Sequence, residues 1–184
     1  YMIMAPWAKI YKTEYLVQNN ITFLENNLGE DMYFNLKALL LGKVKCIDYV
    51  GYNWFFNTQS VSNTIQKNIT QLQVYELINA CYDMLKNEGI LEKNYEMLEA
   101  HFIKYIIWLI LFSTKRLDYK TISKEYDKLF TWLRNHFPNY KKNKVIRMWK
   151  PKSELVSVRM IVVFMTIANK AKFGKITIYL YGKI

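Results

Sequence analysis

The chain has 184 residues and a formal net charge of +11, and 52% of its residues are hydrophobic. This length suits one domain of ordinary size or two small ones, and the apolar content excludes a disordered chain. The charge is uneven, because residues 1–99 contain 8 Lys or Arg and 11 Asp or Glu, whereas residues 100–184 contain 18 and 4. We therefore expect the two parts of the chain to face different partners or to serve different functions.

The sequence begins at Tyr1 rather than at Met, and we interpret it as a chain whose N-terminal part lies outside these residues. Its two cysteines, Cys46 and Cys81, lie among apolar residues at no metal-ligand spacing. They are expected to be buried free thiols in a reducing compartment. His101 and His136 belong to no zinc-binding motif, so no metal site is predicted within the chain.

The first third of the chain mixes helical and strand-like patterns. Residues 13–19 are expected to form a short helix. Residues 30–41 are expected to form a helix that ends at Gly42, because glycine takes the positive φ that helix ends often use. The β-branched and aromatic segment 43–56 predicts one or two strands. The polar residues 57–64 then predict a loop.

This loop gives the expected domain boundary, between residues 62 and 63, and after it the apolar positions repeat with a helical period. The two longest apolar stretches, 105–112 and 155–168, are shorter than the ~20 residues of a membrane span, so we expect core helices. The tail 173–184 is compatible with a strand or with a short amphipathic helix. The expected helices cover about residues 69–88, before Gly89; 92–112; 122–137, before Pro138; and 153–168.

Two adjacent acidic residues, Glu30 and Asp31, open the predicted helix 30–41. Free N–H groups and the helix dipole favour negative charge in a first turn, so both residues have a structural role at a helix start. The alternative is that one of them is a catalytic base. The pair alone does not decide between these roles.

The motifs around this pair follow a recognisable order. The chain contains Trp7-x-Lys9-x-Tyr11, then Ile21-x-Phe23, Glu30-Asp31, Tyr52-x-Trp54 and Ser60-Val61-Ser62. This order resembles the second half of the catalytic domain of family 2 glycosyltransferases, which have the GT-A fold. Over about residues 4–64, the chain is most similar in character to bacterial enzymes that build capsular and other surface polysaccharides.

The resemblance implies a fold, and it implies that the donor-binding half of the catalytic domain lies outside these residues. It predicts an α+β fold that is mostly α, with an acceptor-side remnant of a GT-A domain at residues 1–62 and a basic helical domain at residues 63–184. Trp54 and Phe55 stand where the family has Tyr and Arg. No Asp-x-Asp occurs in the chain, so the donor-binding half and its divalent metal, Mg²⁺ or Mn²⁺, are expected outside these residues.

The resemblance also implies an activity. Such enzymes are inverting transferases that move a sugar from a nucleotide-sugar donor to an acceptor hydroxyl. Asp31 corresponds to the base that accepts the hydroxyl proton, and Glu30 is expected to support the loop or the acceptor. Trp7 is expected to stack on a sugar or to pack in the core, and Lys9 to contact a phosphate or to remain solvated. Trp54 is a further candidate for substrate binding, and the 184 residues alone are expected to be inactive.

The segment 134–152 contains seven Lys or Arg and no acidic residue, with Phe137, Tyr140 and Trp149 interleaved. It is a solvated loop, a contact with an anionic membrane, or a contact with nucleic acid. A saccharide or lipid-linked acceptor favours the membrane over nucleic acid and predicts a cytoplasmic enzyme, peripheral on the inner face of the plasma membrane. The alternative function is a non-enzymatic basic helical module that binds nucleic acid or anionic membrane.

Overall fold

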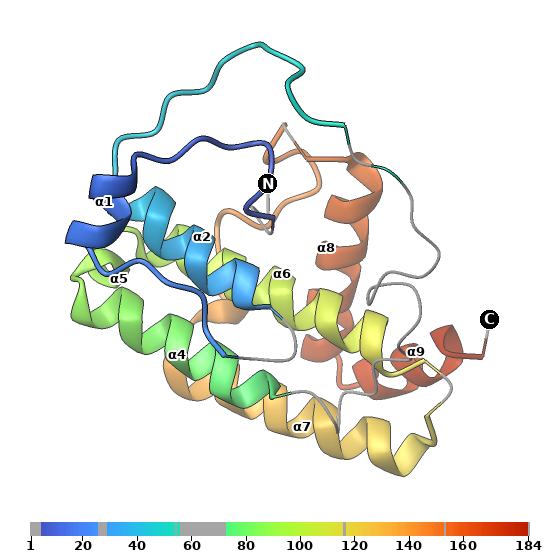
Figure 1. Cartoon of the computed structure of the whole chain (residues 1–184). Coiled ribbons are helices and arrows are strands. Elements are labelled where there is room, and N and C mark those ends of the chain that lie inside the picture. The colour runs from blue at the N-terminus through green and yellow to red at the C-terminus, as the bar shows by residue number, and fades with distance from the viewer. Residues whose placement is uncertain are drawn as a thin grey trace. The chain divides into compact units, whose positions relative to one another are not determined.

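The computed structural model describes residues 5–25, 29–53, 55, 73–115, 117–152 and 154–183, which are mostly helical (Figure 1). They form two compact units, an N-terminal unit up to Lys93 and a C-terminal unit from Asn94 onward. The predicted predominance of α-helix is confirmed. The predicted boundary between residues 62 and 63 lies outside the described residues.

The N-terminal unit consists of short helices around a small apolar core. The predicted helices near residues 13 and 30 are confirmed as α1, Thr13–Gln18, and α2, Glu30–Leu40. Helix α4, Val74–Asn87, packs on α2 and on the single turn α5, Ile90–Lys93. Helix α4 forms as predicted because its apolar residues repeat at helical spacing and end before Gly89. The buried side chains of α4 are Val74, Leu77, Ile78, Cys81, Met84 and Leu85.

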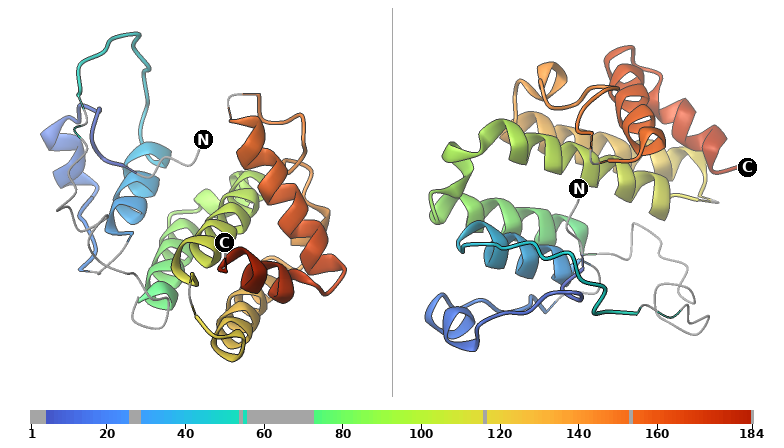
Figure 2. Two further views of the ribbon diagram at one scale, coloured as in Figure 1. Left: turned by 90° about the vertical axis from the view of Figure 1, so that its right-hand side faces the viewer. Right: turned by 90° about the horizontal axis from the view of Figure 1, so that it is seen from above.

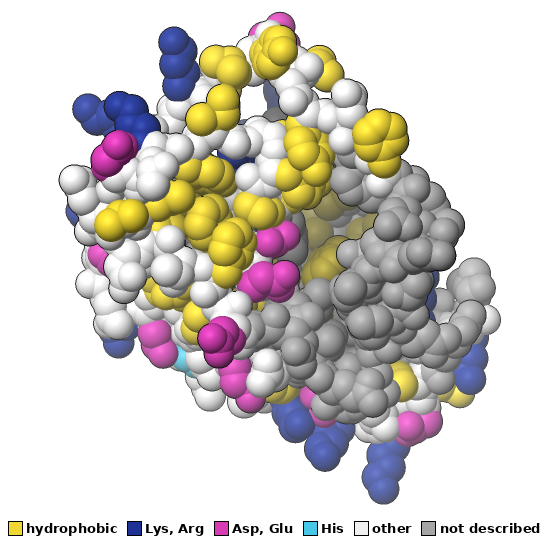
Figure 3. Space-filling model, viewed as in Figure 1, with side chains coloured by type: hydrophobic (Ala, Val, Ile, Leu, Met, Phe, Trp, Pro, Cys, Tyr) yellow, Lys and Arg dark blue, Asp and Glu magenta, His cyan; other side chains and the backbone are white. Residues whose placement is uncertain are grey.

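The strand prediction for residues 43–56 is wrong for 43–53, which carry no strand and are exposed. A β-branched and aromatic segment forms a strand only where another strand accepts its hydrogen bonds, and the described part of the chain offers none. Hydrophobic side chains at the upper edge of Figure 3 mark the path of this segment in Figure 1. Cys46 within it is exposed, so only Cys81 is the buried thiol that we expected.

The C-terminal unit is built around one central helix, α6, Tyr95–Ser113, which contacts every other helix of the unit (Figure 2). Those helices are α7, Tyr119–His136; the 3-10 turn η2, Tyr140–Lys142; α8, Val156–Lys170; and α9, Gly174–Tyr181. The tail is therefore a helix rather than a strand. Residues 105–112 contribute five buried side chains to the core, as expected, whereas Trp108 and Phe112 in the same stretch are exposed.

A chain of polar contacts joins three elements of this unit. The hydroxyl of Tyr126 on α7 donates to Oδ1 of Asn169 on α8 at 3.1 Å, and Nδ2 of Asn169 donates to the hydroxyl of Tyr140 at 2.7 Å. A β-carbon at Gly174 would collide with the Tyr126 hydroxyl, so the first residue of α9 is glycine because it packs directly on this tyrosine. The contacts fix α8 and α9 against α7.

A buried ion pair holds the start of α8 to α6. Nζ of Lys104 donates to both carboxylate oxygens of Glu154 at 2.9 Å, and about a tenth of each side chain is exposed. A buried charge that loses its partner is strongly destabilising, because it keeps its desolvation cost without the compensating attraction.

We expect Glu154→Gln to lower the free energy of unfolding by about 3 kcal/mol, measured by urea denaturation, because it leaves Lys104 unpaired. The matched control is Glu96→Gln, whose carboxylate lies 3.8 Å from Lys144 with both side chains more than half exposed. That change should cost less than about 0.5 kcal/mol. Equal losses in the two variants would show that burial does not strengthen the Lys104–Glu154 pair.

Candidate functional site

The acidic pair lies where the sequence placed it, in the first turn of α2. The chain enters the helix through Gly29, whose φ of 86° is in the left-handed region that favours glycine. Glycine has no capping side chain, so the first turn relies on backbone contacts such as the 2.8 Å bond from Met32 N–H to the Gly29 carbonyl. The helix dipole favours a carboxylate at both acidic positions.

Asp31 is partly buried, and this burial changes the proton affinity of its carboxyl group. Burial raises the pKa of its carboxyl above the usual value, and the negative charge of Glu30 raises it further. The positive charge of Lys9 opposes both effects. Asp31 in turn raises the pKa of the Tyr11 hydroxyl, although burial of the tyrosine is the larger cause. Asp31, Glu30, Lys9 and Tyr11 therefore form one electrostatic cluster.

The segment that carries Lys9 and Tyr11 is held on α2 by a buried asparagine. The Tyr11 hydroxyl donates to Oδ1 of Asn35 at 3.3 Å, and Nδ2 of Asn35 donates to the backbone carbonyl of Asp31 at 2.8 Å. The Tyr11 ring meets Phe34 edge to face, with the ring centroids 5.3 Å apart. Asn35 is 1% exposed, so this polar side chain is satisfied inside the unit and aligns the segment with the Asp31 turn.

Lys9 is turned toward its own segment. Its Nζ donates to the backbone carbonyls of Ala5 and Trp7, and burial lowers its pKa while Asp31 raises it. A lysine with two carbonyl acceptors keeps one N–H free for another group, because the ammonium has three donors. The structure thus places Lys9 beside Asp31 and fixes the loop around it.

Trp7, on the same segment as Lys9, pairs with a second aromatic residue from segment 43–53. The rings of Trp7 and Tyr52 are stacked, with centroids 5.1 Å apart and 13° between their planes. Trp7 remains 47% exposed, so it is not a core residue, and a flat side chain is left for an outside group. Trp54, the other predicted aromatic, lies outside the described residues.

Sequence reasoning named Tyr11 and Tyr52 only as parts of motifs, and it did not single out Asn35. Asn35 had a detectable signal, because a polar amide on the buried side of α2 requires hydrogen-bond partners. The sequence contains no pattern that predicts the pairing of Tyr52 with Trp7. These residues are far apart in the sequence, and they meet only in the folded chain.

The cluster does not fit a divalent cation. Over the described ranges, no three Asp, Glu, His or Cys side chains lie close enough to hold a metal ion. Lys9 also places a positive charge next to Asp31. Asp31 and Glu30 are therefore suited to proton transfer and hydrogen bonding rather than to metal ligation.

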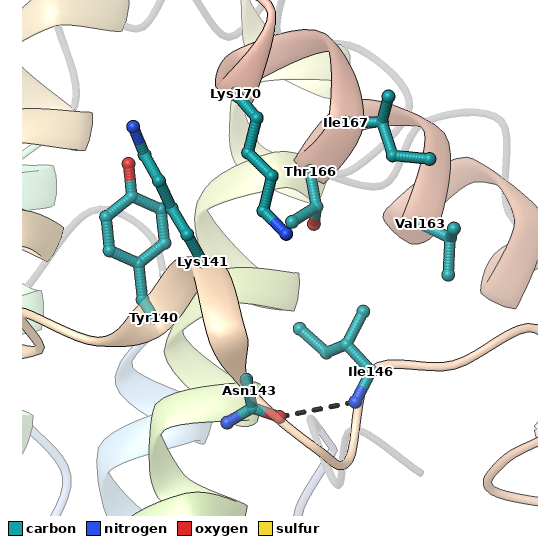
Figure 4. A pocket seen from close by; sticks show the side chains of 8 residues that line it. All are labelled: Tyr140, Lys141, Asn143, Ile146, Val163, Thr166, Ile167 and Lys170. Carbon is teal, nitrogen blue, oxygen red and sulfur yellow. Dashed lines mark hydrogen bonds between the residues drawn. The ribbon is translucent and has the colours of Figure 1, made fainter.

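The C-terminal unit contains a small hollow of about 100 Å³ between η2 and α8 (Figure 4). The side chain of Lys170 points into it, while Oδ1 of Asn143 accepts the backbone N–H groups of Val145 and Ile146 at 2.9 and 3.2 Å. Cationic, uncharged polar and apolar side chains line the hollow, and none of the lining residues is acidic. Its lining residues are Tyr140, Lys141, Asn143, Ile146, Val163, Thr166, Ile167 and Lys170.

Comparison with known proteins found no matching family model, no matching curated protein and no matching solved structure. None of the helices in the described ranges is long and apolar enough to cross a membrane. Functional inference therefore depends on the geometry of the two units.

From the charges around Asp31 we predict how its pKa changes when a neighbouring charge is removed. We expect Glu30→Gln to lower the pKa of Asp31, because a repelling charge is removed, and Lys9→Met to raise it, because an attracting charge is removed. The measurement is the carboxyl carbon shift of Asp31 by NMR over a pH series. The control is Glu14→Gln in the first turn of α1, which should leave that titration unchanged. Shifts of the opposite sign would contradict the arrangement.

Proposed function

We propose that this chain supplies the acceptor side of an inverting family 2 glycosyltransferase, with Asp31 as the general base. The observation that supports the proposal best is the position of Asp31, a partly buried carboxylate at a helix start with a raised pKa. The exposed Trp7, stacked on Tyr52, lies on the segment that packs beside it and offers an aromatic surface of the kind that sugars use. The order of motifs in the sequence points to the same activity.

In the proposed reaction, the acceptor side of the enzyme supplies the base that accepts the hydroxyl proton. The acceptor hydroxyl oxygen attacks the anomeric carbon of the donor sugar, and the bond from that carbon to the nucleoside diphosphate breaks. The hydroxyl proton passes to a carboxylate oxygen of Asp31 as the new bond forms. A base with a raised pKa accepts this proton more readily than an ordinary aspartate does.

The neighbours of Asp31 have supporting roles in the proposal. Burial and, after it, Glu30 raise the pKa of Asp31, whereas Lys9 limits that rise and favours the ionised form. Tyr11 and Asn35 position the segment, and Trp7 supports the acceptor sugar, with Trp54 as a further candidate. Mg²⁺ or Mn²⁺ remains assigned to the donor side, since the residues around Asp31 do not fit a metal.

The proposal extends to surface polysaccharide synthesis with a saccharide or lipid-linked acceptor. We place the enzyme on the inner face of the plasma membrane, because lipid-linked acceptors would be presented there. The strongly basic composition after residue 100 suits such an anionic surface. The runner-up, a non-enzymatic basic module, is favoured by that same charge but gives no role to the Asp31 cluster.

The test is Asp31→Asn in the complete polypeptide that carries this chain. We expect sugar transfer to fall about 10²- to 10⁴-fold, the usual contribution of a positioned base, while the thermal unfolding midpoint changes little. Transfer is measured with radiolabelled nucleotide-sugars and lipid-linked or saccharide acceptors. The wild-type rate should fall at low pH as Asp31 becomes protonated, at a pH above that of an ordinary aspartate.

Glu14→Gln, an acidic residue on α1, is the control and should retain full activity. Wild-type turnover by the Asp31→Asn variant would remove Asp31 from the role of base. Failure of the wild-type polypeptide to transfer any tested sugar, together with unchanged Asp31 titration on adding acceptor, would remove the transferase assignment itself.

A further inference from the structure

Helix α8 is apolar on two faces. Val162, Met165 and Ala168 are buried against the unit. Val156, Met160, Phe164 and Ile167 recur at intervals of four, four and three residues, so they share the opposite face, and each is 50% to 58% exposed. A surface helix normally carries polar residues there. The expectation that residues 155–168 form a core helix therefore holds for only one side of α8.

The exposed apolar surface continues onto α9. The rings of Phe164 and Phe173 are neighbours, with centroids 6.3 Å apart, and Phe173 directly precedes α9. Ile176 and Leu180 follow at helical spacing and are more than half exposed. We call the outward side chains of α8, with Phe173, Ile176 and Leu180, the α8–α9 face. A contiguous apolar surface of this kind marks an interaction site.

The stretch of sequence that carries this face is almost entirely cationic, and Lys175 on α9 is paired with Asp127 on the neighbouring α7. Residues 141–183 contain 11 Lys or Arg and one acidic residue, Glu154, whose carboxylate is buried against Lys104. Among the described residues of that stretch, no acidic side chain therefore faces solvent. Lys170 and Lys172 follow directly after the outward row of α8, and Ile167 belongs both to the face and to the hollow that Lys170 enters (Figure 4).

We propose that the α8–α9 face docks on an anionic lipid bilayer, with its apolar side chains among the acyl chains and Lys170 and Lys172 on the lipid phosphates. Charge complementarity selects this partner. A second copy of the chain would bring the same positive charge against itself. Nucleic acid would match the charge, but it would leave the aliphatic residues Val156, Met160 and Ile167 without apolar contacts.

The mode of binding is interfacial. Helix α8 has 15 residues and α9 has 8, too short for a bilayer of about 30 Å, so they lie in the plane of the membrane surface. Basic side chains beside an apolar face are the pattern of such helices. This inference does not rest on the role of Asp31, so either assignment can fail alone.

The experiment is co-sedimentation of the intact chain with vesicles. We expect binding to vesicles of phosphatidylcholine with about 30% phosphatidylglycerol, weak binding to pure phosphatidylcholine, and loss of affinity as salt rises to about 0.5 M. The triple variant Met160→Gln, Phe164→Gln, Ile167→Gln should bind at least about tenfold more weakly, because less apolar area is buried. Its control is Met97→Gln on α6, a comparably exposed methionine outside the face.

The charge contribution is tested separately. Lys170→Gln with Lys172→Gln should weaken binding about fivefold for each lysine. The matched control, Lys43→Gln with Lys45→Gln, removes the same charge from the N-terminal unit and should change binding less than about threefold. All of the substituted side chains are exposed or at the surface, so circular dichroism should show unchanged folding. If the triple variant misfolds, co-sedimentation of the double-lysine variant still tests the proposal.

The depth of insertion gives an independent readout. In a Cys46→Ser background, an environment-sensitive dye at Phe164→Cys should shift to the blue with anionic vesicles, and one at Thr131→Cys on α7 should not. Equal binding to neutral vesicles, wild-type binding by both the triple variant and the double-lysine variant, or a dye shift at both positions would overturn the proposal. Tighter binding to single-stranded RNA or duplex DNA than to vesicles, or a stable dimer broken by the triple variant, would also overturn it.

Discussion

Hydrogen bonds between tyrosine hydroxyls and asparagine amides hold the Asp31 turn in one unit and helix α8 in the other. In the N-terminal unit, Asn35 accepts from Tyr11 and donates to the carbonyl of Asp31. In the C-terminal unit, Asn169 accepts from Tyr126 and donates to Tyr140. An amide has a donor and an acceptor at one end of a short side chain, so it can join two elements that share no backbone hydrogen bonds. The Asp31 cluster depends on the first contact, and the orientation of α8 depends on the second.

The two units also divide the charge of the chain. Residues 1–93 contain 8 Lys or Arg and 9 Asp or Glu, and their notable group is a carboxylate in a partly buried turn. The basic excess belongs to the remainder, where it accompanies an exposed apolar face. A partly buried carboxylate with a raised pKa and a cationic apolar surface are suited to different partners. The two proposals therefore assign chemistry to the first unit and membrane attachment to the second.

A helix that is apolar on both sides has to be explained by what lies on each side. The buried row of α8 packs within the C-terminal unit, where it contacts α6 and α9. The outward row costs free energy in water, because apolar area is left exposed, and that cost is removed when an apolar phase covers it. The absence of solvent-facing acids among the described residues 141–183 then favours an anionic phase. An exposed apolar surface alone is compatible with several classes of partner. The positive charge beside it favours an anionic partner.

Several features of this protein follow from sequence alone. The apolar repeat of α4 and α7 predicts their helices, and Gly89 and Pro138 predict where such helices stop. The first turn of α2 with its acidic pair was also predictable, because acids and a glycine mark a helix start. These patterns are local, and local backbone preference together with one buried face is enough to specify a helix.

The tertiary structure decided what depends on contacts between distant residues. Residues 43–53 have strand propensity but lack a partner, so the propensity has no effect. The tail pattern fits a strand or a helix, and packing of Gly174 on Tyr126 accompanies the helix. Trp7 meets Tyr52, and Asn35 meets Tyr11, only in the folded chain. Sequence likewise shows that α8 is apolar, but burial of one face and exposure of the other are set by which elements pack against it.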